Sequence, residues 1–249
     1  MKEIAGARIV ENREVARGTR WMVFEAEDEL PDVYAPGHIV ALYVPDPAGR
    51  WVRHPYSVSW ADGPRIGVLY RVIPHGRTSP FMAMMQPGET LRLGGSFGEP
   101  VARLVGDAPA LVGVCTGTGL GPLRGFALRH AGERPTTLLA GFRERVDVPF
   151  AEEMAGLAAA HRTFSWRPTL SRPDAAWDGL RGRVTAHLGA VAVPGAHWHV
   201  VGNGAMVADV RAGLLAAGVA PARVTTETYF DGSASPDPTV VARIAAALG

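Results

Sequence analysis

A change in hydrophobic pattern near residue 105 divides the chain into two halves that require different folds. Up to about residue 104, short segments of alternating apolar and polar residues are separated by turn sequences such as Ala35-Pro36-Gly37 and Gln86-Pro87-Gly88. Many short strands at this spacing are typical of an antiparallel barrel. From Ala108 on, apolar runs alternate with helical segments, as in a parallel sheet covered on both faces. The sequence therefore predicts a β-barrel domain over residues 1–104 and an α/β parallel-sheet domain over residues 105–249.

The same patterns place the individual elements. The expected strands are Ala7–Val10, Arg20–Glu25, His38–Val44, Tyr56–Trp60, Ile66–Ile73 and Thr90–Leu93 in the first half, and Ala110–Val114, Thr137–Ala140, Arg162–Trp166, His197–Val201 and Arg223–Thr226 in the second. The expected helices are Ser79–Met85, Gly121–His130, Phe150–Ala159, Arg183–Leu188, Ala205–Leu215 and Thr239–Leu248. Strands alternating with helices in the second half indicate βαβ units.

Charge and cysteine content exclude several classes of function. The formal net charge is +1, so no strong field favours nucleic acid or an anionic membrane as a partner. The one cysteine, Cys115, cannot form an internal disulfide, a four-cysteine iron–sulfur cluster or a cysteine-based zinc site, and we expect no metal. The first residues have scattered charges and no apolar run typical of a signal peptide. No segment approaches the roughly 18 apolar residues of a membrane span, so the expected compartment is the cytoplasm.

Two glycine-rich turns each follow an apolar strand and precede a helix. The first, Gly117-Thr118-Gly119-Leu120-Gly121-Pro122, would let the backbone approach a pyrophosphate while the N–H groups of the helix start face its negative charge. The alternative is a tight turn without a ligand. The second turn contains Gly202, Asn203 and Gly204 and is followed by Met206. Its alternative is an ordinary loop whose methionine packs into the core.

Two motifs in the barrel half combine cations, hydroxyl groups and an aromatic ring. The segment Arg53-His54-Pro55-Tyr56-Ser57 places cationic side chains just before a tyrosine and a serine, and its alternative is a strand with a half-buried tyrosine. The segment from Val72 to Phe81 contains Gly76, Arg77, Thr78 and Ser79 before a helix, which indicates an anion site. A capped helix, with Thr78 or Ser79 as the cap and Pro80 in the first turn, is compatible with that reading.

The last strand ends in Glu227-Thr228-Tyr229, which places a carboxylate and an aromatic ring at the sheet edge that carries the glycine turns. Taken alone, this is better read as a strand end with an exposed glutamate. Taken in order, however, the motifs HPYS, GRTSP, GTGLGP, VGNGAM and ETY resemble those of the ferredoxin–NADP⁺ reductase superfamily, from about Ala7 to Phe230. The resemblance implies a flavoprotein oxidoreductase that binds FAD in the barrel and a nicotinamide dinucleotide in the second domain.

The resemblance also implies a role for each matching residue. Tyr56 would lie against the isoalloxazine ring, Ser57 would hydrogen-bond near flavin N5, and Glu227 and Tyr229 match the terminal carboxylate and aromatic pair. Ser57, Glu227 and Tyr229 are thus the expected catalytic residues. The expected cofactor-binding residues are Arg53, His54, Pro55, Tyr56, Ser57, Val72, Gly76, Arg77, Thr78 and Ser79 for FAD, and Gly117, Thr118, Gly119, Pro122, Arg143, Ser171, Arg172, Arg183, Gly202, Asn203 and Met206 for the dinucleotide.

Two positions depart from the pattern of the superfamily. His54 stands where an arginine is usual, and an imidazole is largely neutral at pH 7. Either binding of the flavin phosphate is then weaker, or Arg53 and Arg77 supply the charge. Val201 replaces a cysteine, which should leave hydride transfer intact because the flavin supplies the chemistry. About 20 residues follow Tyr229, and they either cover the flavin or pack aside.

The choice of nucleotide depends on the 2′-phosphate. Arg143, Arg172 and Arg183 fall in loops expected on the adenosine side, and guanidinium groups suit a phosphate dianion. We therefore expect NADPH, with NADH as the alternative. The expected activity is hydride transfer between NADPH and FAD, with electrons passed singly to a ferredoxin or flavodoxin. The alternatives are an NADH-dependent reductase component of an oxygenase and an electron-transfer subunit of a larger complex.

Overall fold

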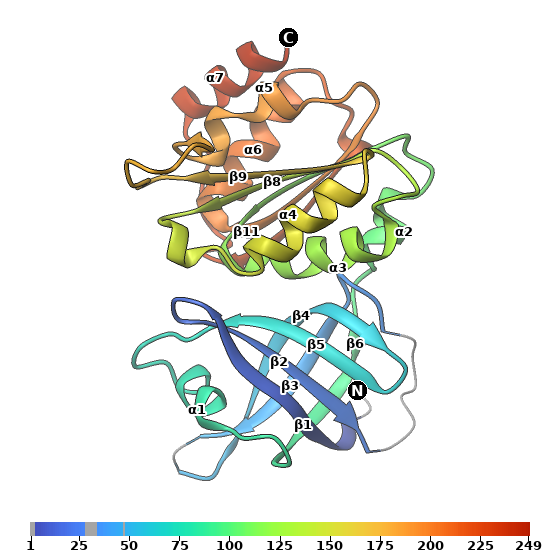
Figure 1. The fold of residues 1–249 in the computed structure, drawn as a ribbon, viewed down its shortest axis with the longest axis vertical. Helices are drawn as coiled ribbons and strands as arrows, with labels where there is room; N and C mark the ends of the chain where they lie inside the picture. Colours follow the sequence, from blue (N-terminus) through green and yellow to red (C-terminus); the bar gives the residue numbers. More distant parts are fainter. Residues whose placement is uncertain (1–2, 28–33, 47) are drawn as a thin grey trace. The chain divides into compact units, whose positions relative to one another are not determined.

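The computed structural model describes residues 3–27, 34–46 and 48–249, which cluster into two compact units (Figure 1). The first unit comprises Met1–Arg103 together with Gly121–Phe126, and the second comprises Leu104–Leu120 together with Ala127–Gly249. Within the described ranges, no helix is long and apolar enough to cross a membrane.

The first unit is built on a closed barrel of antiparallel strands, which confirms the barrel expected from the alternating segments. Its strands are β1 (Glu3–Ala16), β2 (Thr19–Ala26), β3 (Ile39–Pro45), β4 (Trp51–Asp62), β5 (Arg65–Arg71) and β6 (Thr90–Phe97). Hydrogen-bonded neighbours follow the order β1-β2-β5-β4-β3-β6, and β6 closes the ring by pairing with β1.

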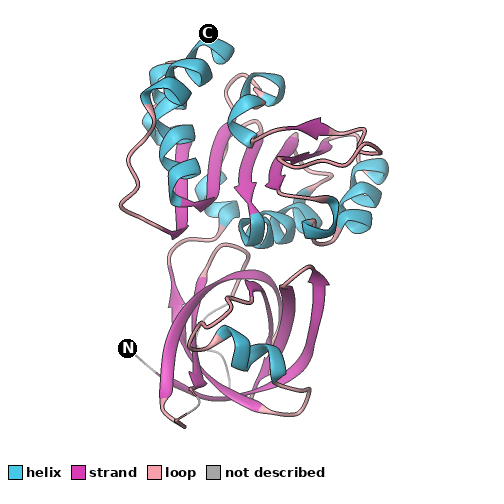
Figure 2. Cartoon of the chain, turned by 90° about the vertical axis from the view of Figure 1, so that its left-hand side faces the viewer, coloured by secondary structure: helices cyan, strands magenta, loops and turns pink. Residues whose placement is uncertain are grey.

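Apolar side chains at alternating strand positions fill the barrel. Met22 and Phe24 of β2 and Val40 and Leu42 of β3 are fully buried in one cluster, because every second side chain of a strand points to the same face. The short helix α1 (Ser79–Met84) lies at one end of the barrel, where Met82 enters the same cluster (Figures 1 and 2). The barrel is therefore a packed core, closed at one end by α1.

Strand β1 is much longer than the expected Ala7–Val10. It reaches Ala16 through a polar stretch that pairs with β2 beyond a register shift between Ile9 and Glu11. A β-bulge of this kind interrupts the alternation from which strands are predicted, so the polar continuation is not visible in the sequence.

The second unit contains a six-stranded parallel sheet, as expected from the strand–helix alternation. Its strands are β7 (Leu111–Thr116), β8 (Thr136–Phe142), β9 (Phe164–Leu170), β10 (Leu180–Arg181), β11 (His197–Asn203) and β12 (Val224–Phe230). The helices that follow the barrel are α2 (Val101–Val105), α3 (Leu120–His130), α4 (Ala151–Ala160), α5 (Leu188–Val191), α6 (Gly204–Ala216) and α7 (Pro238–Leu248). The strand order is β10-β9-β8-β7-β11-β12, so β12 lies at an edge.

Helices cover both faces of this sheet (Figure 1). On one face, Val112, Val114 and Val200 pack against Val210 of α6 and Ile244 of α7 in one buried cluster. Helix α4 lies on the other face (Figure 1). Burial on both faces explains why the strands read as continuous apolar runs rather than as alternating segments.

Two local features differ from the sequence-based expectation, and a third matches one of its two alternatives. The segment Arg183–Leu188 is not one helix but a single 3-10 turn (Val184–Ala186) followed by α5, and it comes directly after Gly182, which has φ of 108°. Strand β10 has 2 residues and α2 has 5, too few to show a period in the sequence. The tail after Tyr229 packs aside, because α7 places Ile244 against Gly213 of α6.

Candidate functional site

In the first unit, the HPYS motif lies within β4 and its side chains alternate in exposure. Arg53 and Pro55 are exposed, whereas His54 and Tyr56 are half-buried on the opposite face of the strand. Ser57 is also half-buried. The motif therefore presents an arginine on one side of the strand and an imidazole and a phenol on the other.

Tyr56 is held by the barrel core and by α1. Its hydroxyl donates to Met82 Sδ at 3.2 Å, and its ring lies edge-on to Tyr70 with the centroids 6.2 Å apart. Burial raises the pKa of Tyr56 to about 12, and the nearby Tyr70 acts in the same direction. The phenol is therefore neutral at physiological pH, and its half-buried ring has a fixed position.

His54 and Arg53 differ in charge. Burial, and then the positive charge of Arg77, hold the pKa of His54 below its usual value, so this imidazole is neutral at pH 7. Arg53 extends on the other side of the strand, with its Cζ 5.4 Å from the ring centroid of Phe97. In this part of the site, Arg53 carries a positive charge and His54 does not.

A tight turn precedes α1 and contains the second barrel motif. The Gly76 N–H donates to the Ile73 carbonyl at 2.8 Å, His75 has φ of 62°, and Ser79 Oγ accepts from the Ile73 N–H at 2.9 Å. A Cβ at Gly76 would lie 2.9 Å from the Ile73 oxygen, so the turn requires glycine there. The Ser79 hydroxyl thus braces the turn from within.

The remaining residues of this motif have distinct environments. Thr78 is buried and occupies the N-cap position of α1, but its side chain makes no capping hydrogen bond; Pro80 lies in the first turn, as the capped-helix reading expected. Val72 is half-buried and packs against the barrel core. Arg77 is exposed, and its Nη2 lies 3.7 Å from Oδ2 of Asp46, a residue that the sequence analysis did not single out.

In the second unit, the first glycine turn forms where β7 ends. Gly117, Thr118 and Gly119 make one 3-10 turn, and α3 follows with Pro122 in its first turn. Gly117 has φ of 55°, and a Cβ there would meet nothing within 4 Å. A Cβ at Gly119 would instead lie 2.5 Å from the Val201 carbonyl oxygen, so glycine at this position lets the turn approach the end of β11.

The second glycine turn meets the first across the sheet edge. The Asn203 N–H donates to Thr116 Oγ1 at 3.1 Å. Gly202 has φ of 139°, and a Cβ there would lie 2.4 Å from the same hydroxyl oxygen. Sequence reasoning missed Thr116, because a threonine at a strand end carries no signal of its own. Met206 is buried in the core cluster of α6, so its side chain packs as the loop reading expected.

Glu227 and Tyr229 are half-buried residues of the edge strand β12. Glu227 is in register with Val201, which is in turn in register with Cys115 of β7. A register shift follows at Tyr229, after Thr228 has paired with Gly202. The carboxylate therefore lies at the same end of the sheet as both glycine turns.

Two buried histidines of β11 flank the hydroxyl group of a threonine in β12. Thr225 Oγ1 lies 2.7 Å from His197 Nε2 and 2.8 Å from His199 Nδ1. Burial, and then the nearby His197, lower the pKa of His199 to about 4. Burial and the charge of Arg223 also lower the pKa of His197. Both rings are therefore neutral at pH 7, and they join β11 to β12 through side chains.

The three expected arginines gather where β8, β9 and β10 end. The Arg172 N–H donates to the Arg143 carbonyl at 2.8 Å, and the Ser171 N–H donates to the Phe142 carbonyl at 3.0 Å. Arg183 follows β10 and begins the 3-10 turn. All three arginine side chains are exposed and make no hydrogen bond or ion pair with another described residue. Two other arginines, Arg145 and Arg181, are instead engaged with the loop of Trp177.

Each unit thus offers a site of its own. The barrel combines exposed cations with a fixed aromatic ring and a glycine turn, which suits an anionic ligand with an aromatic group. The sheet edge combines two glycine turns, a carboxylate and exposed arginines at the carboxyl ends of parallel strands, where such sheets bind ligands. Among the described residues, no group of histidine, cysteine and acidic side chains could hold a metal ion.

Comparisons with known proteins agree with this arrangement. The family described as "Oxidoreductase NAD-binding domain" matches residues 114–212, from β7 to α6. A protein named ferredoxin–NADP reductase B from Sorangium cellulosum is 33% identical over 218 residues, which are 82% of this chain and 88% of that protein.

Two solved structures share the fold over most of the chain. A cytochrome P450 reductase from Amycolatopsis superposes with a TM-score of 0.75 and 27% identity, covering 91% of this chain and 69% of that chain. A ferredoxin NADP⁺ reductase from Neisseria gonorrhoeae, solved with bound FAD and NADP, superposes with a TM-score of 0.75 and 21% identity, covering 92% of this chain and all (100%) of that chain. The similarity to the Neisseria gonorrhoeae structure, at 21% identity, concerns the fold alone.

Proposed function

The chain belongs to the ferredoxin–NADP⁺ reductase superfamily and is an oxidoreductase; on that premise we propose that it transfers a hydride between NADPH and a bound FAD and passes electrons singly to a ferredoxin or flavodoxin. When bound, the flavin supplies the redox chemistry, because it exchanges a hydride with nicotinamide and releases electrons one at a time. The residues of the chain bind and orient the two cofactors.

The barrel residues fit FAD. Arg53 and Arg77 supply exposed positive charge for a pyrophosphate, and the turn at Gly76 has no side chain that would block the approach of an anion. Tyr56 offers the exposed part of a fixed ring for the isoalloxazine, while Ser57, half-buried at the next position of β4, would donate a hydrogen bond near flavin N5.

The sheet edge fits the nicotinamide dinucleotide. The turn Gly117–Gly119 would hold its pyrophosphate, with Gly202 and Asn203 beside the nicotinamide, and Glu227 would orient that ring. Arg143, Arg172 and Arg183 would surround the 2′-phosphate that distinguishes NADPH from NADH. The convergence of both glycine turns and Glu227 at one sheet edge is the observation that carries the proposal. Steady-state reduction of ferricyanide by the purified protein, with NADPH and then with NADH, tests it.

One rival function has a specific observation in its favour. The chain is 27% identical to a protein named cytochrome P450 reductase, which favours the alternative of a reductase component of an oxygenase, for which we expect NADH as the nucleotide. The same assay separates the two functions. A kcat/KM that favours NADH over NADPH would support the oxygenase-type reductase and would assign the three arginines to the protein surface.

The purified protein is expected to be yellow and to release FAD rather than FMN on denaturation. The exposed Arg53 and Arg77 come from two different motifs of the barrel, and we expect them to meet the two phosphate groups of FAD. Chromatography of the released flavin gives the answer. FMN alone, or no flavin after reconstitution, would contradict the proposal for the barrel.

Replacing Arg172 with alanine is expected to raise KM for NADPH about tenfold, with little change in KM for NADH. The arginine is exposed, so solvent screening keeps its pair with the 2′-phosphate at the low end of charge-assisted hydrogen bonds. Steady-state kinetics with both nucleotides measure the difference. Arg167→Ala removes an exposed arginine from β9 and serves as the control. Equal effects of Arg172→Ala on both nucleotides would show that Arg172 is only a surface charge.

A further inference from the structure

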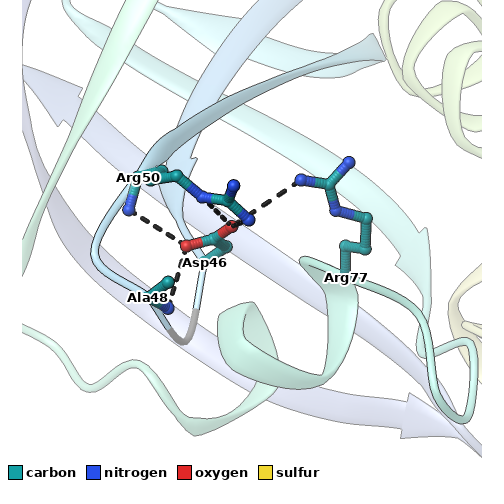
Figure 3. A network of polar contacts seen from close by, with 4 residues as sticks. All are labelled: Asp46, Ala48, Arg50 and Arg77. Atoms are coloured by element: carbon teal, nitrogen blue, oxygen red, sulfur yellow. Dashed lines mark hydrogen bonds and ion pairs between the residues drawn. The ribbon is translucent and has the colours of Figure 1, made fainter.

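Asp46 is a buried carboxylate at the end of β3, and every contact that it makes holds a cation or a turn in place (Figure 3). Its Oδ1 accepts from the backbone N–H groups of Ala48 and Arg50 at 2.9 and 3.0 Å. Its Oδ2 accepts from Nε and Nη2 of Arg50 at 3.0 and 2.8 Å. The hydrogen bonds from Arg50, side chain first, lower the pKa of Asp46. The carboxylate is therefore ionised at physiological pH.

The same oxygen also faces Arg77, which comes from the turn before α1. Nη2 of Arg77 lies 3.7 Å from Asp46 Oδ2 (Figure 3). Although Asp46 is only 4% exposed, the side chains of Arg50 and Arg77 are 71% and 67% exposed. Asp46 thus contacts one edge of each guanidinium, and the other edges of the two guanidinium groups stay open to solvent. Two guanidinium groups and one carboxylate leave the cluster with one net positive charge.

The charge of Arg77 matters because of His54. Burial and the proximity of Arg77 lower the pKa of that imidazole, so His54 is neutral at pH 7. An anion bound beside the HPYS motif must then obtain its positive charge from neighbouring residues. Arg77 is close enough to His54 to influence its pKa, and it is the cation that Asp46 holds.

We propose that Asp46 is a positioning residue that orients Arg77 for the pyrophosphate of FAD. The inference rests on the proposed function, since it assumes FAD in the barrel. A long arginine side chain loses rotamer entropy when it is fixed in one orientation. In this protein the entropy of Arg77 would already be lost on folding, so its guanidinium would be oriented before the pyrophosphate binds.

If Asp46 acted only through its charge, removing that charge would change FAD binding in the opposite direction from the one expected of a positioning residue. A carboxylate next to a bound pyrophosphate repels it, so removing the charge should tighten binding if Asp46 does nothing else. Removing it should weaken binding if Asp46 positions Arg77. The sign of the change therefore separates the two roles, and measurements at two salt concentrations show how far charge–charge interactions contribute to it.

The test measures flavin binding to the apo-protein, with FAD and with riboflavin, by titration calorimetry at low and high salt. Asp46→Asn keeps the shape of the side chain and an oxygen acceptor for the turn. It is expected to weaken FAD binding by up to about fivefold, the upper end of what an exposed ion pair contributes, and to leave the binding of riboflavin, which has no phosphate, unchanged. Asp62→Asn removes an exposed carboxylate from the same barrel and is the matched control for net charge.

A double-mutant cycle identifies the residue through which Asp46 acts. Arg77→Ala should weaken FAD binding, and adding Asp46→Asn to it should have little further effect. Equal or tighter FAD binding by Asp46→Asn, or additive effects in the cycle, would overturn the inference. If Asp46→Asn does not fold, Asp46→Ser retains an oxygen for the Ala48 N–H and replaces it in every arm. Failure of the wild-type apo-protein to bind FAD would instead refute the proposed function.

Discussion

Lowering the pH from 7 to 5 is expected to reduce the free energy of unfolding of the second unit by about 2 kcal/mol, because His199 must remain neutral in the folded state. The folded protein holds the pKa of this histidine at about 4, against an ordinary value of 6.5. As the pH falls through 6.5, the unfolded chain takes up a proton that the folded chain does not bind until about pH 4. The free energy of unfolding therefore falls progressively between pH 6.5 and about pH 4. Above pH 6.5, His199 causes no loss of stability.

The position of His199 explains the size of this effect. The ring is 2% exposed and lies within hydrogen-bond distance of Thr225 Oγ1 through Nδ1 only. Its Nε2 is buried without a hydrogen-bond partner among the described residues. A charged imidazole would thus carry an N–H group at Nε2 that donates to no described residue. His197, whose pKa is also lowered, adds to the loss of stability in the same direction.

Denaturant titrations at pH 5 and pH 7, together with hydrogen exchange of the β11 and β12 amides, measure this change where it arises. His199→Leu should flatten the pH dependence, even if it changes the stability at pH 7. His161→Gln removes a half-buried histidine at the end of α4 and serves as the control for loss of a histidine elsewhere in the unit. A His199→Leu protein that loses stability with acid as steeply as the wild type would show that other groups govern the transition.

Replacing Glu227 with glutamine is expected to slow hydride transfer about 10- to 100-fold, an effect of roughly 1.4 to 2.7 kcal/mol on the barrier. The substitution keeps the shape of the side chain and removes its charge. Because Glu227 is in register with Val201 and next to the turn of Gly202, a carboxylate there would orient the nicotinamide and stabilise charge that develops during transfer. FAD content should be unchanged, since Glu227 belongs to the second unit.

Stopped-flow reduction of the flavin by NADPH measures this step directly. Glu152→Gln, which removes an exposed carboxylate from α4 of the same unit, controls for the change in net charge. Flavin reduction at the wild-type rate in Glu227→Gln would leave Glu227 as a structural residue at the end of a strand.

The order of elements could be predicted from the sequence because its signals are local. Strands such as β2 and β3 alternate clearly, and β7 and β11 form apolar runs, so their type and approximate bounds follow from the residues alone. The second half of β1 could not be predicted, since the hydrogen bonds that define it lie on β2 and follow a register shift. Strand β10 exists only because Leu180 and Arg181 pair with β9.

The residues of the candidate site also divide into those with a local signal in the sequence and those whose roles depend on distant partners. Glycine turns such as Gly117–Gly119 are visible because closely spaced glycines between an apolar strand and a helix stand out in the sequence. Asp46 and Thr116 were missed because their roles depend on partners distant in sequence, Arg77 and Asn203. His197 and His199 gave no signal either, since the hydroxyl that they flank belongs to the next strand.

The loop between β9 and β10 is ordered by contacts of its own. Trp177 Nε1 donates to the Leu180 carbonyl at 2.8 Å, and the Arg145 guanidinium lies over the indole ring, with Cζ 5.1 Å from its centroid. The backbone that carries Ser171 and Arg172 therefore needs no rearrangement before a nucleotide phosphate arrives. For the proposed enzyme, diffusional encounter rather than loop closure would set the rate of nucleotide capture, and differences in affinity between nucleotides would appear in how fast they leave.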